Sequence, residues 1–451
     1  MRNRYLDLLR AAAIVRVIVY HLYGWPWLSV VLPAMGIMFA LAGSFTAASL
    51  RERPTEHVVA ARLRRVLPPL WLLGIIAVPV MLVAGWAQET GGEHPFRLSR
   101  LLLWIVPIGD PPGSELGVDA WEPLWYVRAY VWFALLSPVL LALYRRIGWA
   151  AVALPLALMG ALELAGFALP EAVDSALWDF VTYGACWIAG FAHQDGRLAR
   201  LRPWVVAAVA VALGAAAFYW LRNVSGADSW DLTEVSESQA LWSLAFVLVA
   251  LRWQPPMGWL ARVRPLDAAV TLLNARAVTV YLWHNIAIAA VWPVLAVLAL
   301  DDFGVRVEWA AELGTALVLT LLAVLALGWS EDLAARRRPR FWPIHESALR
   351  SEQADEWSGP PLVGVVVEAP RRRPPGGTAA GGPLPAAWPP APRSARRATI
   401  PEPEVPSTQA RIIEEWVAAT QPAGAVFRDE TRDLSLPSGD ETRDLSGKRE
   451  H

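Results

Sequence analysis

The sequence predicts an all-α protein: a bundle of about ten membrane-spanning helices with both termini in the cytoplasm, followed by a disordered tail. Three observations predict this class. Apolar runs recur through the first three quarters of the chain, and arginines concentrate in alternate connections between them. After residue 342 the composition shifts to Pro, Gly, Ala, Arg and Glu. The expected domains are therefore a transmembrane bundle over 1–342 and a cytoplasmic tail over 343–451.

The overall composition excludes several classes of protein. With 55% hydrophobic and 18% charged residues, the 451-residue chain is too apolar for an ordinary soluble domain. Cys186 is the only cysteine, so an intrachain disulfide and a thiolate metal cluster are excluded, and no metal is expected. No nucleic-acid partner is expected. Asp7, Arg10 and Arg16 interrupt the apolar core that a signal peptide needs, which favours an uncleaved first span.

Each candidate span is an apolar run of about the length that crosses the hydrocarbon core, roughly 17–25 residues. The candidates are approximately 6–24, 30–50, 66–86, 123–144, 149–168, 176–194, 203–221, 238–252, 276–299 and 308–329. The eighth is short. The stretch Leu101–Pro107 is too short to cross and is expected in an interfacial loop.

The arginines predict the orientation of these spans. If the N-terminus is cytoplasmic, the inner segments hold 20 arginines and the outer segments hold four, at positions 97, 100, 222 and 306. Cytoplasmic loops of membrane proteins carry an excess of Lys and Arg, so this arrangement favours a multi-pass protein of the cytoplasmic membrane. Trp residues near the predicted span ends are typical of interfacial belts and receive no chemical role.

The tail has too few apolar residues to fold alone. The amphipathic stretch 412–417 is a possible helix for a protein partner. The heptapeptide at 429–435 recurs at 440–446, either as a duplicated docking or phosphorylation motif or through replication slippage.

Ionisable residues within the first predicted span are candidates for function, because charges inside a membrane are costly. Arg10 and His21 are eleven residues apart, which places them on nearly the same helix face about 16 Å apart along the axis. Asp7 lies one turn below Arg10, and Arg16 lies on another face. We expect Arg10 and His21 to line one cavity, with the imidazole suited to act as a general base. The alternative is a structural Asp7–Arg10 pair and a merely interfacial histidine.

Further candidates lie in later spans. Arg62 and Arg65 share a helix face at the predicted entrance of the third span, where an arginine pair suits a phosphate group. Positive-inside retention and lipid headgroups explain such a pair equally well. Arg128, Tyr281 and His284 are other candidates, although a lone histidine in a bundle is more often a packing residue. Glu122 and Glu163 are weaker ones.

Five segments in order resemble motifs of the acyltransferase-3 family of membrane O-acyltransferases. They are Arg10 with His21, Met38–Ser44, Arg62 and Arg65 with Pro68 and Trp71, Leu124–Val127, and Tyr281 with His284. The resemblance covers residues 5 to about 330 and includes the ten-span layout. Many relatives have a Glu near the position of Tyr130, and the branch without it resembles sugar O-acetylases. The tail shows no nucleophile turn of the hydrolase domain fused to some relatives.

The resemblance implies transfer of an acyl group, usually acetyl, from cytoplasmic acyl-CoA to a hydroxyl of an envelope sugar, glycolipid or secreted glycoside. Arg62 and Arg65 would hold the phosphates of the acyl-CoA. His21 would act as the base or accept the acyl group, and Arg10 would position the donor or orient a carboxylate. The expected partners are a carbohydrate or glycolipid acceptor and membrane lipids.

Two other classes of function stay open at this stage. Intramembrane Asp, Arg and His also suit a proton-coupled transporter or flippase, although the halves of the chain show no inverted repeat. The second open class is a scaffold protein whose tail recruits partners.

Overall fold

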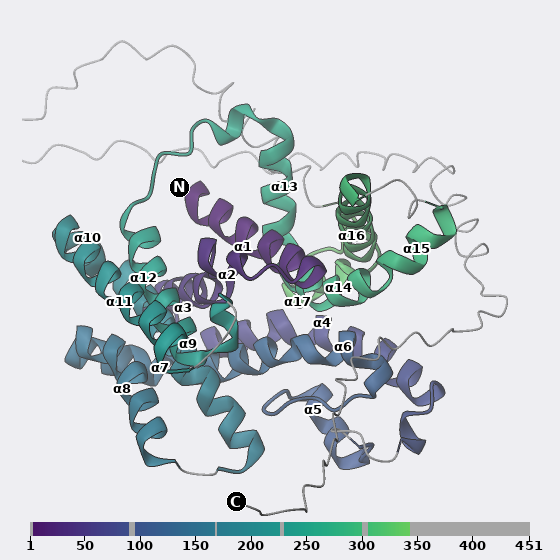
Figure 1. Ribbon diagram of the computed structural model, residues 1–451, viewed down its shortest axis with the longest axis horizontal. Coiled ribbons are helices and arrows are strands. Elements are labelled where there is room, and N and C mark those ends of the chain that lie inside the picture. The colour runs from purple at the N-terminus through teal and green to yellow at the C-terminus, as the bar shows by residue number, and fades with distance from the viewer. Residues whose placement is uncertain (1–2, 90–94, 167–168, 226–229, 300–304, 343–451) are drawn as a thin grey trace, which may run out of the picture. The chain divides into compact units, whose positions relative to one another are not determined.

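The computed structural model describes residues 3–89, 95–166, 169–225, 230–299 and 305–342 (Figure 1). All regular structure in these residues is helical, which confirms the predicted all-α class. The predicted tail, with its amphipathic stretch and its repeated heptapeptide, lies outside the described residues.

A helix or a pair of helices occupies each predicted span. They are α1 (Arg4–Tyr23), α2 (Trp27–Val31) with α3 (Ala34–Glu52), α4 (Thr55–Val83), α7 (Trp125–Ile147), α8 (Trp149–Ala165), α9 (Glu171–Gln194), α11 (Pro203–Asn223), α12 (Ser236–Arg252), α14 (Ala277–Ala289) with α15 (Val291–Leu298), and α16 (Val305–Leu327). Five helical segments are long and apolar enough to cross a membrane, and α14 with α15, bent by 50°, makes a sixth if it counts as one span. The protein is therefore a helical membrane protein. The count of ten spans and the orientation stay predictions.

Shorter elements connect these helices. They are η1 (Trp86–Gln88), η2 (Leu98–Leu101), α5 (Leu102–Ile105), η3 (Glu115–Gly117), α6 (Val118–Trp121), η4 (Glu122–Leu124), α10 (Arg197–Arg200), η5 (Leu232–Glu234), η6 (Leu260–Arg262), α13 (Arg264–Ala275) and α17 (Trp329–Ala334). The four-residue α5 falls within Leu101–Pro107 and is only about 6 Å long, too short for a span.

The third predicted span starts earlier than expected. Helix α4 begins at Thr55 and continues through Pro68 and Pro69, for 29 residues in all. Prolines persist in membrane helices when neighbouring groups satisfy the freed backbone carbonyls. At 1.5 Å per residue the helix is about 43 Å long, more than the roughly 30 Å hydrocarbon core. Arg62 and Arg65 therefore lie two to three turns inside a continuous helix rather than at its entrance.

Close packing between α3 and α9 holds the middle of the bundle together. A Cβ on Gly43 would clash with the Trp187 carbonyl, and a Cβ on Gly190 would clash with the Ala40 carbonyl. Small residues of this kind let two membrane helices approach closely. The ring of Trp187 also stacks on Phe133 of α7, with ring centroids 5.0 Å apart.

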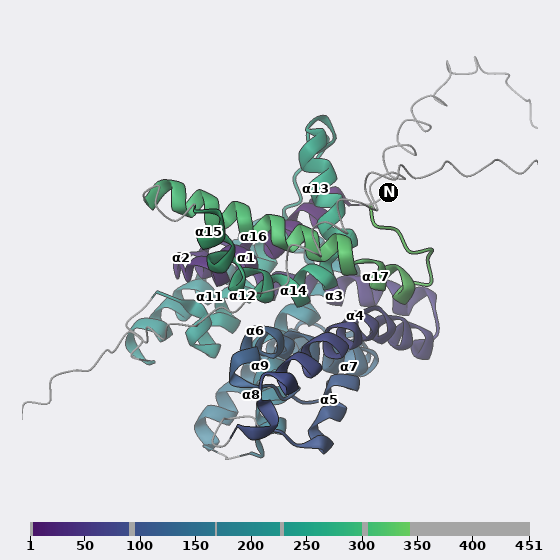
Figure 2. The same ribbon diagram turned by 90° about the vertical axis from the view of Figure 1, so that its right-hand side faces the viewer.

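The remaining helices enclose the region in which the candidate residues lie. Helix α1 packs against α3, α13 and α14, and α17 packs against α4. Figure 2 shows α17 and the beginning of α4 at the same end of the bundle as the described N-terminus. Residues separated by more than 300 positions thus line one space.

Candidate functional site

A cavity of about 540 Å³ opens between α1, α3, α4, α7, α14 and α17. We call it the arginine cavity. Five of the residues singled out in the sequence line it: Asp7 and Arg10 on α1, Arg62 and Arg65 on α4, and Tyr281 on α14. The shared face of Arg62 and Arg65 thus faces the cavity that Arg10 lines.

The three arginines of this cavity form no ion pair with any described residue. Arg62 donates a hydrogen bond to the Ser49 hydroxyl at 3.2 Å, and Arg10 is half-buried. Three guanidinium groups facing one space give it a positive potential. Because their donors are not occupied by carboxylates, they are available to an anionic ligand.

The cavity also has two carboxylates, both buried. Asp7 forms an ion pair with Arg4 at 3.2 Å, and Arg4 pairs in turn with Asp267. Glu331 accepts hydrogen bonds from the Thr279 backbone N–H and hydroxyl, both at 2.7 Å. Glu331 lies in α17, beyond the last apolar helix, and burial raises the pKa of its carboxyl above the ordinary value. Sequence reasoning missed Glu331 because nothing in the pattern shows that α17 folds back onto α4.

Beyond this cavity lies a pair of histidines. His284 is 1% exposed, and its Nδ1 lies 2.5 Å from the Tyr281 carbonyl oxygen. A carbonyl can only accept, so Nδ1 carries the proton and Nε2 keeps its lone pair. His284 Nε2 is buried and has no hydrogen-bond partner among the described residues. The ring of His21, which is exposed at the last turn of α1, lies edge-on to it with centroids 5.2 Å apart.

The expectation that Arg10 and His21 line one cavity is wrong. Arg10 lines the arginine cavity, whereas His21 lies on the far side of His284. The axial separation of about 16 Å leaves room for side chains of α3, α7 and α14 between the two residues.

A narrow crevice joins the two regions. Met38, Tyr126 and Tyr281 line both the arginine cavity and this crevice, and His284 also lines the crevice. The crevice measures about 10 Å³, room for about one water molecule. The rings of Tyr126 and Tyr281 lie 4.7 Å apart across it, and the Tyr281 hydroxyl donates to the Pro123 carbonyl at 2.8 Å.

Arg128 lies outside this site. Its buried guanidinium forms ion pairs with Asp110 and with Asp179, the latter at 2.6 Å. These bonds tie the connection after α5 to α9. Glu122 and Glu163, the weaker candidates, do not line the arginine cavity either.

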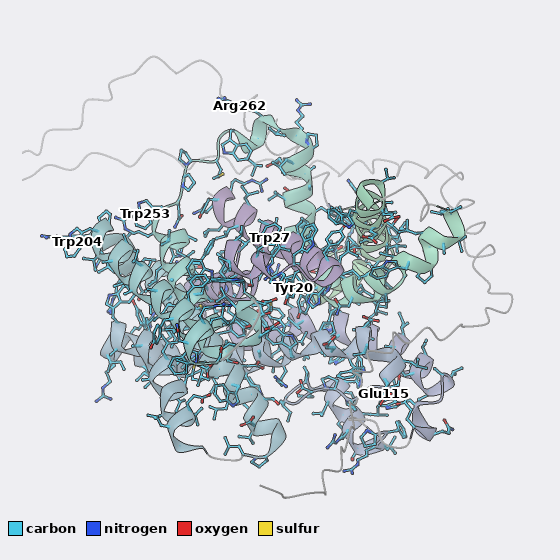
Figure 3. The ribbon with its side chains drawn as sticks, in the orientation of Figure 1. Tyr20, Trp27, Glu115, Trp204, Trp253 and Arg262 are labelled. Carbon is cyan, nitrogen blue, oxygen red and sulfur yellow. The ribbon has the colours of Figure 1, made fainter. Side chains whose placement is uncertain are left out.

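Arg16 lies on a different face of α1 from Arg10, as the helical spacing predicts. It donates to the Leu28 carbonyl at 3.2 Å and lies over the Tyr20 ring, 4.4 Å from its centroid. The Tyr20 hydroxyl donates to Asp231 at 2.6 Å. Figure 3 labels Tyr20 and Trp27 at this end of α1.

Four further residues line the cavity wall: Tyr126 and Tyr130, which were noted in the sequence without a site role, and His193 and Asn274, which were missed. Tyr130 places an aromatic ring at this wall. His193 bonds through Nε2 to the Gln254 amide at 2.7 Å and through Nδ1 to the Ser44 hydroxyl at 2.9 Å. Only the folded bundle brings α9 and α13 to this wall.

The described part of the chain holds no cluster of three or more His, Cys, Asp or Glu suited to a metal ion. Fold and site together define a helical membrane protein with a cation-lined cavity and a buried imidazole beyond it. A family model described as an acyltransferase domain matches residues 3–330. The chain belongs to the acyltransferase-3 family and is a membrane acyltransferase. No curated protein and no solved structure matched it.

Proposed function

We propose that this protein transfers an acyl group, acetyl in the simplest case, from cytoplasmic acyl-CoA to a hydroxyl of an envelope sugar, glycolipid or secreted glycoside. The observation that carries the proposal is the arginine cavity, with three guanidinium groups that lack ion-pair partners among the described residues. A transporter for a neutral or cationic solute has no use for such a set. A bound acyl-CoA would place its phosphates at these guanidinium groups and its thioester beyond the arginine cavity.

The donor would bind with its pyrophosphate at Arg62 and Arg65. Both side chains lie on one face of α4, and Arg guanidinium matches phosphate oxygens in a bidentate geometry. Arg10 lies on α1, the helix that also carries His21. It would therefore hold the donor on the path to the histidine pair.

The pantetheine arm would carry the thioester through the crevice. At about 10 Å³ the crevice is closed to an arm of this width, so side chains must move. Met38 is the unbranched and most adaptable of the shared lining residues. A narrow passage that opens only for the arm keeps water away from the thioester.

The transfer itself would take place at the histidine pair. His21 removes the proton of the acceptor hydroxyl as its oxygen attacks the thioester carbonyl carbon. The carbon–sulfur bond breaks, and the thiolate leaves with that proton as free CoA. Alternatively, His21 takes the acyl group first and then passes it to the acceptor. The neighbouring His284 offers its free Nε2 lone pair to a proton in this space and orients the reacting imidazole.

Radiolabelled acetyl-CoA with membranes containing the protein tests this function. The expected result is release of free CoA together with label on an envelope glycan or glycolipid. Transport without chemistry, the alternative, would leave acetyl-CoA intact and label no acceptor. Deletion of residues 343–451 distinguishes the enzyme from a scaffold. A scaffold would lose its function with the tail, whereas acyl transfer is expected to survive the deletion.

A further inference from the structure

A second basic surface borders α4 next to the arginine cavity. It is a groove of about 500 Å³ between the N-terminal half of α4 and the C-terminal end of α17. We call it the basic groove. Its basic lining residues are Arg53, His57, Arg64, Arg65, Arg336 and Arg337. Figure 2 shows the two helices side by side at this end of the bundle.

The charge of the basic groove is of one sign. No carboxylate is among its lining residues, and none of its five arginines forms an ion pair with a described residue. Outside the lining, Glu56 lies 3.5 Å from His57, with both side chains exposed. Glu331 interacts electrostatically with Arg65 from the arginine cavity. Gathering guanidinium groups in one concave surface is unfavourable unless an anion is bound there.

The end of α17, which forms one wall of the groove, has a defined backbone structure. Helix α17 ends in a motif in which the Arg336 N–H bonds to the Leu333 carbonyl and the Arg337 N–H bonds to the Asp332 carbonyl. The residue after such a helix end adopts a left-handed conformation and is usually Gly. Arg336 stands there instead, with φ 56°. An arginine side chain therefore occupies a position at which the backbone conformation favours Gly, which points to a role for that side chain.

Hydrogen bonds to Asp332 and Arg276 also fix the segment after α17. The Asp332 carboxylate accepts from Arg276 at 2.6 Å and from the Arg340 N–H at 3.0 Å. Arg276, which is 1% exposed, also donates to the Arg340 carbonyl at 2.6 Å. These bonds hold residues 336–340 against the bundle, so Arg336 and Arg337 face α4 from a defined position.

We propose that the basic groove binds a phosphate group distinct from the one held in the arginine cavity. Arg65 lines both spaces, so the two phosphates would lie on opposite sides of one side chain. Two sources supply a phosphate of this chemistry. One is the 3′-phosphate of the same acyl-CoA, which is set apart from the pyrophosphate by the ribose; this source rests on the proposed function. The other is the headgroup of an anionic phospholipid.

The test compares CoA with 3′-dephospho-CoA on the purified full-length protein, and labelled phosphatidylglycerol with phosphatidylcholine. Three variants are used. Arg336→Gly and Arg337→Gln remove groove cations, and Arg338→Gln removes a neighbouring cation that does not line the groove. Arg336→Gly also relieves the backbone, so its melting temperature is expected to equal or exceed that of the wild type. A loss of binding in that variant therefore does not come from misfolding.

If the acyl-CoA fills the groove, the wild type prefers CoA over 3′-dephospho-CoA by about tenfold, equal to about 1.4 kcal/mol. That preference falls to about one in both groove variants and is kept in Arg338→Gln. If a lipid fills it, the two groove variants lose the preference for phosphatidylglycerol and the nucleotide comparison is unchanged. The proposal is overturned when both groove variants match Arg338→Gln with every probe.

Failure of the proposed function gives a different result. A wild-type protein that binds neither CoA nor its dephospho form removes the acyl-CoA donor and the nucleotide source together. The phosphatidylglycerol comparison then decides alone: a loss in both groove variants supports the phosphate site, and equal retention in all variants overturns it.

Discussion

The arginines in the middle of this molecule fall into two groups that differ in their bonding. Arg128 and Arg276 are almost completely buried, and each is paired with aspartate. Arg10, Arg62 and Arg65 line a cavity and form no ion pair with a described residue. A buried guanidinium whose bonds are satisfied holds segments together, whereas one whose bonds are open has capacity for a ligand.

The same contrast applies to histidine. His193 bonds through both ring nitrogens, to Ser44 and to Gln254. His284 bonds through Nδ1 alone, and its buried Nε2 has no partner among the described residues. The open guanidinium groups of the arginine cavity and the open Nε2 of His284 thus lie along one route, from the arginine cavity through the crevice towards His21. Variants in the two groups are expected to fail in different ways.

The largest effect is expected at the end of that route. His21→Ala should lower the rate of acyl transfer by about 10²–10⁴-fold, the usual contribution of a general base. His21 is exposed, so its removal leaves no cavity and the melting temperature should be unchanged. Donor binding should persist, because the phosphate contacts are elsewhere. Full transfer by a normally inserted His21→Ala protein would remove the proposed mechanism.

Breaking a satisfied pair should instead affect stability. Arg128→Met leaves Asp110 and Asp179 without their cation, and removal of one partner of a buried ion pair costs about 3–5 kcal/mol. Thermal unfolding in detergent measures this loss. The rate per folded molecule should stay near that of the wild type. A stable Arg128→Met protein with a specific defect in transfer would place Arg128 in the site after all.

The open arginines should show the opposite pattern. Arg62→Gln and Arg10→Gln are each expected to raise the KM for acyl-CoA roughly tenfold, the loss of one charge-assisted contact to phosphate. Their melting temperatures should not fall, because neither side chain is ion-paired to a described residue. Arg145→Gln, an exposed arginine at the end of α7, serves as the matched control. Equal KM values in all three variants would contradict a donor site in the arginine cavity.

The sequence predicted the helices well because hydropathy and arginine placement act locally. Each predicted span overlaps a helix or a pair of helices, although α4 begins 11 residues before the predicted start, and the i, i+3 spacing correctly put Arg62 and Arg65 on one face. It listed Arg128 among the further site candidates because the partners that satisfy Arg128 lie 18 and 51 residues away. Nothing in a local pattern reveals such a pairing.

The site was harder to predict than the helices, for a related reason. Helical spacing gave the direction of Arg10 and His21 but not what fills the length between them. Tyr126, Tyr281 and His284 fill it, and they come from α7 and α14. Glu331 and Asn274 reach the cavity wall only because short helices after the apolar spans fold back against the bundle.

Glu331 offers the smallest and most specific test of the contrast. It is a buried carboxylate outside the apolar spans that lines the cavity of the open arginines, and it interacts electrostatically with Arg65. A carboxylate here competes with the donor phosphates, so Glu331→Gln should tighten acyl-CoA binding by about twofold to fivefold at neutral pH. Gln still accepts the Thr279 hydrogen bonds, which keeps the wall intact.

Because its pKa is raised, Glu331 becomes neutral at a higher pH than an ordinary glutamate. The difference between wild type and variant should therefore shrink as the pH is lowered, which titration calorimetry over a pH series measures. Weaker binding in Glu331→Gln would mean that the carboxylate orients Arg65 for the donor rather than competing with it.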